Sequence, residues 1–158
     1  MFSYLMAFLF FVSPCCDKSD DFSCVKFESR RFVGGTVRSP SGTNYILEIE
    51  ANKNIPQIEF EAVWVGNRKF IQLEVLSDSR PWAEKKIKKG DVLTILFKQL
   101  ILHSEPNEEA NPEVDLDGEI SDPPIQYSGN ALVQYSVKGK KKFLEVENMT
   151  QVKPLLYP

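Results

Sequence analysis

The side chains that most often carry catalysis are few in this chain of 158 residues. His103 is the only histidine, so any Ser-His-Asp or Cys-His arrangement would have to use it, and we interpret it as a residue at a strand end. One histidine cannot build a multi-histidine zinc site, and the three cysteines, at positions 15, 16 and 24, form no CxxC pair. We therefore predict no catalytic residues, although carboxylates that the fold brings together would leave no local spacing to find.

The densest group of possible ligands is the acidic segment 104–122, which holds eight carboxylates and no basic residue. Alternate carboxylates followed by Gly118 resemble the first two-thirds of an EF-hand calcium loop, although Pro124 stands where that motif places its bidentate glutamate. The candidate calcium ligands are Glu113, Asp115, Asp117 and Asp122. The interpretation we favour is a solvated acidic loop over residues 104–124 that holds no cofactor, because the departures from the calcium motif are serious.

The N-terminus carries the apolar run MFSYLMAFLFFV at residues 1–12. As a helix this run would span about 18 Å, which is short for roughly 30 Å of bilayer hydrocarbon and typical of a signal peptide. Residues 9–21, LFFVSPCCDKSDD, resemble the leader end of bacterial surface lipoproteins of the Bacteroidetes type. The resemblance implies that residues 1–15 are removed, that Cys16 carries the lipid, and that the protein is exported to the outer membrane or cell surface. Cleavage before Cys15 is one alternative; a plainly secreted protein or an unprocessed anchor helix is another.

Outside the acidic segment the chain is mildly basic, because 14 carboxylates remain there against 19 Lys and Arg residues, a net charge of +5. Lysines concentrate in two runs, at residues 85–89 and 138–142, which together can form one basic surface. Export makes nucleic acid a poor partner for such a surface, which leaves anionic glycan, lipid headgroups or the acidic segment itself. If the lysines bind no partner, their role is to keep the protein soluble.

Residues 57–76 predict a β-hairpin. Apolar residues alternate with polar ones on both sides of Gly66-Asn67, a pair typical of two-residue hairpin turns. This turn gives three facing pairs on the core side of the hairpin, namely Ala62 with Ile71, Phe60 with Leu73, and Ile58 with Val75. The same register opposes Glu59 and Glu74, a like-charge pair that is unfavourable.

The rest of the chain predicts an all-β fold: a single antiparallel β-sandwich or barrel-like domain of about eight strands. One short helix is expected at residues 79–90, because Ser79 can cap it and Gly90 can end it. The domain should cover residues 25–158, after a tether at residues 16–24. Its predicted core comprises Ile58, Phe60, Ala62, Leu73, Val75, Leu93, Ile95, Phe97, Val133, Leu144 and Val146.

These patterns together predict a cell-envelope lipoprotein, tethered to the membrane, whose β-domain is a binding or structural module for a protein or glycan partner. The alternative is a secreted or periplasmic hydrolase whose catalytic carboxylates the sequence does not locate. The two functions need different surfaces. An enzyme requires a deep cleft with converging carboxylates, whereas a binding module presents a shallow or flat exposed patch.

Overall fold

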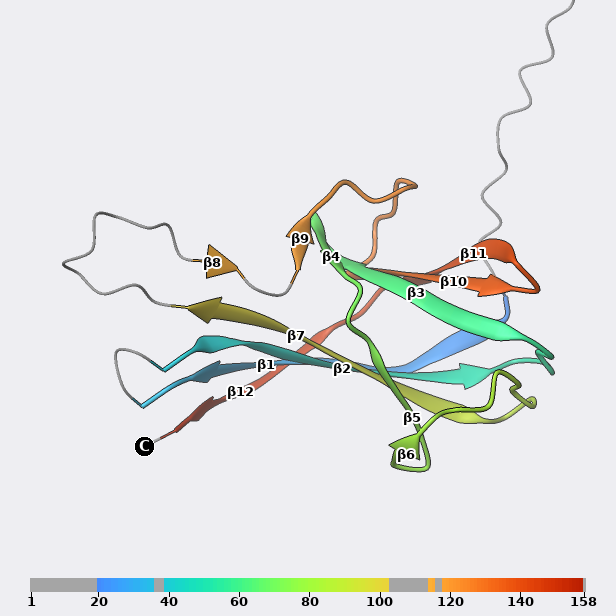
Figure 1. Cartoon of the computed structure of the whole chain (residues 1–158), viewed down its shortest axis with the longest axis horizontal. Coiled ribbons are helices and arrows are strands. Elements are labelled where there is room, and N and C mark those ends of the chain that lie inside the picture. The colour runs from blue at the N-terminus through green and yellow to red at the C-terminus, as the bar shows by residue number, and fades with distance from the viewer. Residues whose placement is uncertain (1–19, 36–38, 103–113, 116–117, 158) are drawn as a thin grey trace, which may run out of the picture.

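The computed structural model of the chain describes residues 20–35, 39–102, 114–115 and 118–157. These residues form twelve β-strands and no helix, arranged in two sheets that lie one above the other (Figure 1). The predicted all-β, sandwich-like fold is therefore confirmed, but with more strands than the roughly eight expected from turn spacing. Three of the additional strands, β6, β8 and β9, are two residues long, too short for period-two alternation to reveal them. The fourth arises because the second strand of the predicted hairpin is divided into β4 and β5.

The larger sheet has seven strands in the order β12–β1–β2–β7–β5–β6, with β8 paired to β7. Its neighbouring strands are antiparallel except β1 and β12, which run parallel. Strand β1 begins at Phe22, inside residues 16–24, which the sequence analysis assigned to the tether. The strands are β1 (Phe22–Val33), β2 (Ser41–Ala51), β5 (Glu74–Ser77), β6 (Arg80–Pro81), β7 (Val92–Leu102), β8 (Val114–Asp115) and β12 (Thr150–Leu156).

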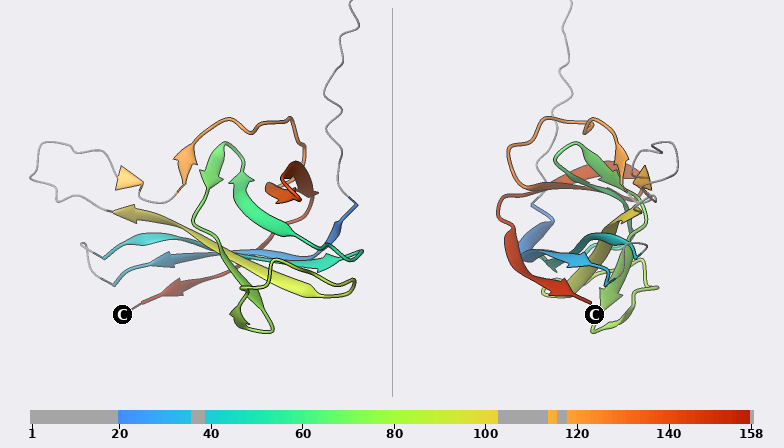
Figure 2. Two further views of the ribbon diagram at one scale, coloured as in Figure 1. Left: turned by 45° about the vertical axis from the view of Figure 1, so that its right-hand side comes forward. Right: turned by 90° about the vertical axis from the view of Figure 1, so that its left-hand side faces the viewer.

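The smaller sheet has five antiparallel strands in the order β11–β10–β3–β4–β9. They are β3 (Ile58–Val65), β4 (Arg68–Phe70), β9 (Glu119–Ile120), β10 (Ala131–Val137) and β11 (Lys140–Val146). Figure 2 shows the two sheets as separate layers. The main core lies between them, where both sheets contribute side chains with no exposed surface: Leu47, Ile49, Ile95, Val63, Val133 and Val146. Burial of this apolar surface is the main force that holds the layers together.

The predicted hairpin has the right turn but the wrong length. Val65 pairs with Arg68 across Gly66-Asn67, as predicted, and Gly66 has the positive φ of 63° that such a turn requires. Pairing stops at Phe70, because the chain then crosses to the seven-stranded sheet and continues there as β5. The three facing pairs predicted beyond this point do not form. The crossing also separates Glu59 from Glu74, so the like-charge pair is avoided.

A β-bulge at Glu61 reverses the faces of β3. Gln134 of β10 pairs with Ala62 and Tyr135 pairs with Phe60, so Glu61 is an extra residue on β3. Before the bulge, even-numbered side chains face the main core, and after it Val63 does. Ala62 is therefore buried as predicted, but on the outer face of the sheet.

The other predicted core residues all belong to the main core. Seven of them are buried: Ile58, Leu93, Ile95, Phe97, Val133, Leu144 and Val146. Phe60, Leu73 and Val75 are only partly buried and pack against the others. Their partial exposure follows from the crossing, because Leu73 lies within it, Val75 follows it in β5, and Phe60 lies on the part of β3 with which β4 does not pair.

A second, smaller core covers the outer face of the five-stranded sheet. Ala62, Trp64 and Leu132 are buried there beneath Ile125 and Tyr127, which belong to the segment after β9, and beside Phe143 of β11. Two contacts hold this covering segment. The Tyr127 hydroxyl donates to the Gly66 carbonyl at 2.8 Å, and the backbone N–H groups of residues 128 and 129 donate to one Glu145 carboxylate oxygen at 2.7 Å each.

The helix predicted at residues 79–90 is wrong. Asp78 and Ser79 both have positive φ and form the two-residue turn between β5 and β6. Further along, backbone groups of this segment bond to other strands, including two bonds between Ile55 and Ile87 at 2.8 and 2.9 Å. Trp82 and Ile87 pack against the main core. Long-range backbone hydrogen bonds therefore replace the intrahelical ones that local sequence favours.

Candidate functional site: a lysine-rich end held by Asp21

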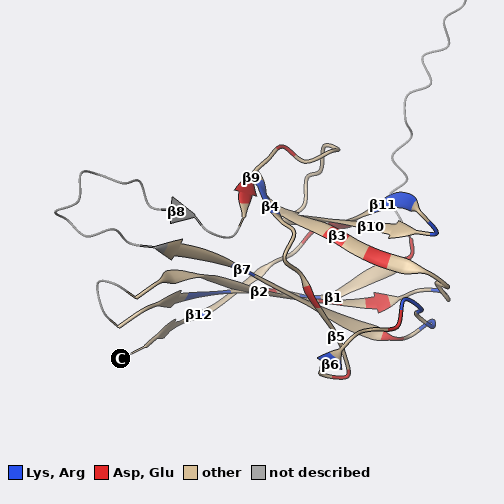
Figure 3. Cartoon of the chain, viewed as in Figure 1, with Lys and Arg blue, Asp and Glu red and all other residues tan. Residues whose placement is uncertain are grey.

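The two predicted lysine runs meet at one end of the sandwich, together with the loop between β2 and β3. The N–H of Ile58 donates to the Lys85 carbonyl at 3.0 Å, and the N–H of Lys138 donates to the Gln57 carbonyl at 3.2 Å. The loop between β2 and β3 therefore joins both runs into one surface, as the sequence suggested. Figure 3 shows basic residues at the turn between β10 and β11 and in the loops nearby. We call this surface the lysine-rich end: Lys53, Lys85, Lys86, Lys88, Lys89, Lys138, Lys140, Lys141 and Lys142.

Asp21 is the buried centre of the lysine-rich end. Its side chain is only about 1% exposed and is surrounded by donors from three distant parts of the chain. Lys53 lies 2.5 Å from one carboxylate oxygen, while Lys142 at 2.8 Å and the Tyr135 hydroxyl at 3.0 Å donate to the other. A buried carboxylate needs such partners, because an unpaired charge is costly to remove from water. Asp21 therefore fixes the start of the fold to β10, β11 and the loop after β2.

Hydrogen bonding to the Asp21 carboxylate, and attraction by its charge, raise the pKa of Lys53. The backbone around Asp21 is fixed as well, because the N–H of Asn52 donates to the Asp21 carbonyl at 2.9 Å. On the neighbouring loop, the N–H of Lys89 donates to the Asn54 side chain at 2.9 Å and that of Lys88 to the Asp91 carboxylate at 2.8 Å. The loops are thus held by their backbones while the lysine side chains point into solvent.

The lysine-rich end is a region of positive charge on a chain whose net charge is −3. Its four segments (residues 20–21, 52–61, 84–91 and 138–142) contain nine lysines and six Asp or Glu residues, a net charge of +3. Three of the six carboxylates lie within 4.0 Å of a lysine ammonium group. These are Asp21, described above, Glu59 with Lys85 at 3.9 Å, and Glu61 with Lys141 at 3.9 Å. Eight of the nine lysines are nevertheless exposed, so the surface presents mainly ammonium groups.

The predicted calcium ligands lie only partly within the described residues. Glu113 and Asp117 lie outside them. The backbone of Asp115 belongs to β8 and pairs with Ile101 of the seven-stranded sheet, and Asp122 is exposed on the segment that follows β9. Among the residues that the structure describes, no three His, Cys, Asp or Glu side chains form a group that could hold a metal ion. The calcium site therefore stays a prediction.

Gly118, which the calcium motif also explains, has a structural role. Its φ is +105°, and a Cβ at this position would lie 2.9 Å from the Phe70 ring. The Arg68 guanidinium also reaches the Gly118 carbonyl, at 3.5 Å. Only glycine combines this conformation with such a close approach, so Gly118 lets the start of β9 pack over Phe70.

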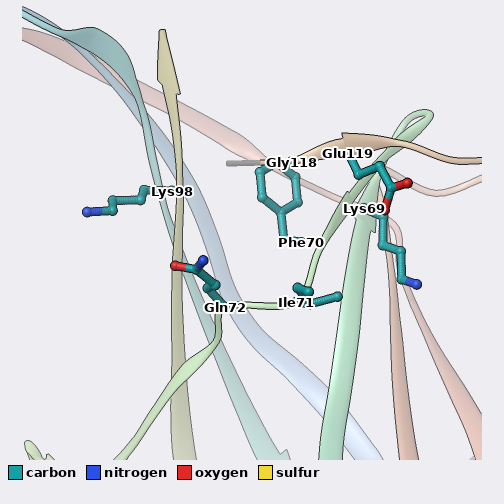
Figure 4. Close-up of a pocket in the computed structure, with 7 residues that line it drawn as sticks. All are labelled: Lys69, Phe70, Ile71, Gln72, Lys98, Gly118 and Glu119. Carbon is teal, nitrogen blue, oxygen red and sulfur yellow. The ribbon is translucent and has the colours of Figure 1, made fainter. Parts of the chain in front are cut away.

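A small hollow of about 150 Å³ lies beside this contact, where the chain crosses between the sheets. Figure 4 shows the Phe70 ring pointing towards Gly118, with Gln72 and Lys98 on one side and Lys69 with Glu119 on the other. Its volume is below the roughly 300–1,000 Å³ of most small-molecule sites. The side chains around it offer both charges and no convergent pair of carboxylates.

Four other hollows among the described residues have volumes of about 410–480 Å³, and only the one beside Glu145 and Glu147 is lined by two carboxylates. Glu145 is already bonded to the backbone of residues 128 and 129. We therefore regard the lysine-rich end as the better candidate.

The nucleophile and base candidates add little. His103, Cys15 and Cys16 lie outside the described residues. Cys24 is exposed and forms no disulfide. Loss of water around its thiol raises the pKa, which disfavours the reactive thiolate. Sequence reasoning missed Asp21, which it assigned to the tether. The local signal was slight, since an Asp-Asp pair before a strand resembles any polar linker and its partners are 32 or more residues away.

No protein-family model, curated protein or solved structure matches the chain. The part of the chain that the structure describes contains no helix long and apolar enough to cross a membrane.

Proposed function

We propose that this protein is a non-catalytic binding module of the cell envelope, tethered to a membrane through a lipid on Cys16. The leader residues 1–15 and the DKSDD sequence after Cys16 support the tether. The observation that carries the proposal is the position at which the chain enters the fold. Asp20 and Asp21 stand four and five residues after Cys16, and Asp21 is already buried in the lysine-rich end.

This position orients the domain. Four residues reach at most about 14 Å, so a lipid on Cys16 would keep the lysine-rich end close to the bilayer. Strand β1 then runs away from the tether for 12 residues, about 36 Å at the usual strand rise. At its far end Val33 lies beside the last residues of β12, where Leu156 is 78% exposed. The far end is therefore the side on which a protein or glycan partner can approach.

The work done by the acidic side chains also supports a binding module over a hydrolase. Asp21 pairs with two lysines, Glu61 accepts a hydrogen bond from Gln134, and Glu145 accepts bonds from the backbone of residues 128 and 129. Each of these carboxylates holds strands or loops together. A glycoside hydrolase needs two carboxyl groups facing one another across a cleft, and these three face lysine, amide and backbone donors instead.

The tether is tested by cell fractionation of the full chain in a bacterial host with the matching lipoprotein pathway. We expect Cys16→Ser to move the protein from the membrane fraction to the soluble fraction. Cys15→Ser and Cys24→Ser are matched controls and should leave it in the membrane fraction. Membrane association that survives Cys16→Ser but not Cys15→Ser would assign the lipid to Cys15. Association that survives both substitutions and a high-salt wash, which removes electrostatic contacts, would mean that residues 1–12 are themselves the anchor.

A further inference from the structure

We propose that the lysine-rich end binds the anionic phospholipid headgroups of the membrane to which the chain is tethered. The inference rests on the proposed function, because it takes the membrane from the tether. The headgroup contact would be a second attachment to the membrane, besides the tether, and would give the domain a defined orientation. The domain would then stand on its lysine-rich end, with β1, β2 and β7 pointing away from the bilayer, instead of moving freely on its tether.

The first argument is geometric. The chain enters the fold next to Lys53 and Lys142, the two lysines that pair with Asp21, so the tether starts within this surface. A bilayer at the other end of a short tether therefore lies within reach of the neighbouring lysines at all times. Electrostatic attraction to anionic lipid acts over a Debye length of about 8–10 Å, comparable to the reach of the tether. A soluble anionic polysaccharide has no such proximity.

The second argument concerns pre-organisation. The lysines lie on three turns, and flexible turns would lose conformational freedom on binding. Here the turns are already joined by backbone hydrogen bonds, between Ile55 and Ile87 and between Lys138 and Gln57. The binding surface therefore exists before it meets a membrane, which reduces the entropic cost of association.

The third argument concerns charge. Asp21, the carboxylate nearest the centre, is buried and neutralised by Lys53 and Lys142, so it does not repel a phosphate. Lys86, Lys89, Lys138 and Lys140 are exposed around it. Each lysine near an anionic surface strengthens binding about fivefold. Because the tether raises the effective concentration of lipid, even a weak contact of this kind is sufficient to orient the domain.

The test measures which end of the domain approaches the bilayer. The chain without its leader residues 1–15, with Cys16 and Cys24 replaced by serine, receives a fluorophore through Lys140→Cys at the lysine-rich end or Leu156→Cys at the far end. Each protein is mixed with phosphatidylcholine vesicles that carry a headgroup quencher, with or without phosphatidylglycerol. We expect strong quenching at position 140 only in the anionic vesicles, reversal by high salt, and little quenching at position 156 in either.

Two charge-matched variants complete the test. Lys86→Gln/Lys89→Gln/Lys138→Gln removes three charges from the lysine-rich end and should lower the preference for anionic vesicles about a hundredfold. Arg31→Gln/Lys98→Gln/Lys153→Gln removes three exposed charges from the sheets and should lower it far less. Circular dichroism should show both variants folded.

Equal quenching at both positions, or equal losses in the two variants, would overturn the proposal. Binding to dextran sulfate without a preference among vesicles would overturn it too and assign the surface to anionic polysaccharide. These outcomes are independent of the tether, because the labelled chains lack Cys16. If Cys16→Ser and Cys15→Ser both stay on salt-washed membranes while the quenching pattern holds, the lipid anchor is wrong and the headgroup contact remains.

Discussion

Two regions of this molecule are ordered by different forces. At the lysine-rich end, a buried carboxylate and backbone hydrogen bonds join loops that are far apart in the sequence. At the crossing, where residues 71–73 pass from one sheet to the other, the ordering contact is steric, with Gly118 packed over the Phe70 ring. The first region places charge on the surface, and the second closes the core beside β4 and β9.

The difference shows how each region responds to change. An ionic centre tolerates small changes in shape but not the loss of its charge, because its partners would then remain without a counter-charge. A steric contact tolerates changes in nearby charge but not one added carbon atom, because interiors are close-packed. Single substitutions can therefore separate the two regions.

The largest effect is expected from Asp21→Asn. Asparagine keeps the shape and can still accept a hydrogen bond from Tyr135, but it removes the charge that Lys53 and Lys142 share. We expect the free energy of unfolding to fall by about 3 kcal/mol, measured by urea denaturation followed by tryptophan fluorescence. Asp20→Asn makes the same change of net charge at an exposed neighbour and should cost at most about 0.5 kcal/mol. Equal losses in the two variants would mean that Asp21 acts only through net charge.

A smaller loss is expected from Gly118→Ala at the crossing. The added methyl would meet the Phe70 ring at 2.9 Å and would force a non-glycine residue to a φ of +105°. We expect a loss of about 2 kcal/mol in the free energy of unfolding. Gly90→Ala is the matched control, because Gly90 has a φ of +89° but no atom within 4 Å of an added Cβ. It should therefore report backbone strain alone, about 1 kcal/mol. If both variants lose the same amount, packing over Phe70 contributes nothing.

Local patterns predicted the parts of the fold that local residues determine. Gly66-Asn67 specified its turn because that turn requires positive φ at the glycine, and the apolar residues of β7 and β10 specified their strands. The bulge at Glu61 was not predictable, since the long-range pairing with β10 creates it. The predicted helix failed for the same reason, because its backbone groups bond to segments that are distant in the sequence, such as Ile55.

The candidate site was predictable to a similar degree. Two lysine runs were visible as composition, but their meeting depends on Gln57 and Ile58, whose backbone groups reach one run each. The sequence did not identify Asp21 as the centre of this surface, because its partners lie in three other segments. Charge content can thus be read from the sequence, whereas the geometry that concentrates charge on one surface depends on tertiary pairing.

The smallest effect is expected from adding calcium. If calcium bound the acidic segment beside Gly118, charge would help to order the crossing, as it does the lysine-rich end. We expect equal melting temperatures with a few millimolar calcium and with chelator, because Pro124 stands where the calcium motif needs its bidentate glutamate. An extracellular loop of this type typically binds calcium at about 0.1–1 mM, so real binding would add on the order of 1–2 kcal/mol. A calcium-dependent rise in melting temperature that disappears in Asp115→Asn/Asp117→Asn would establish the site.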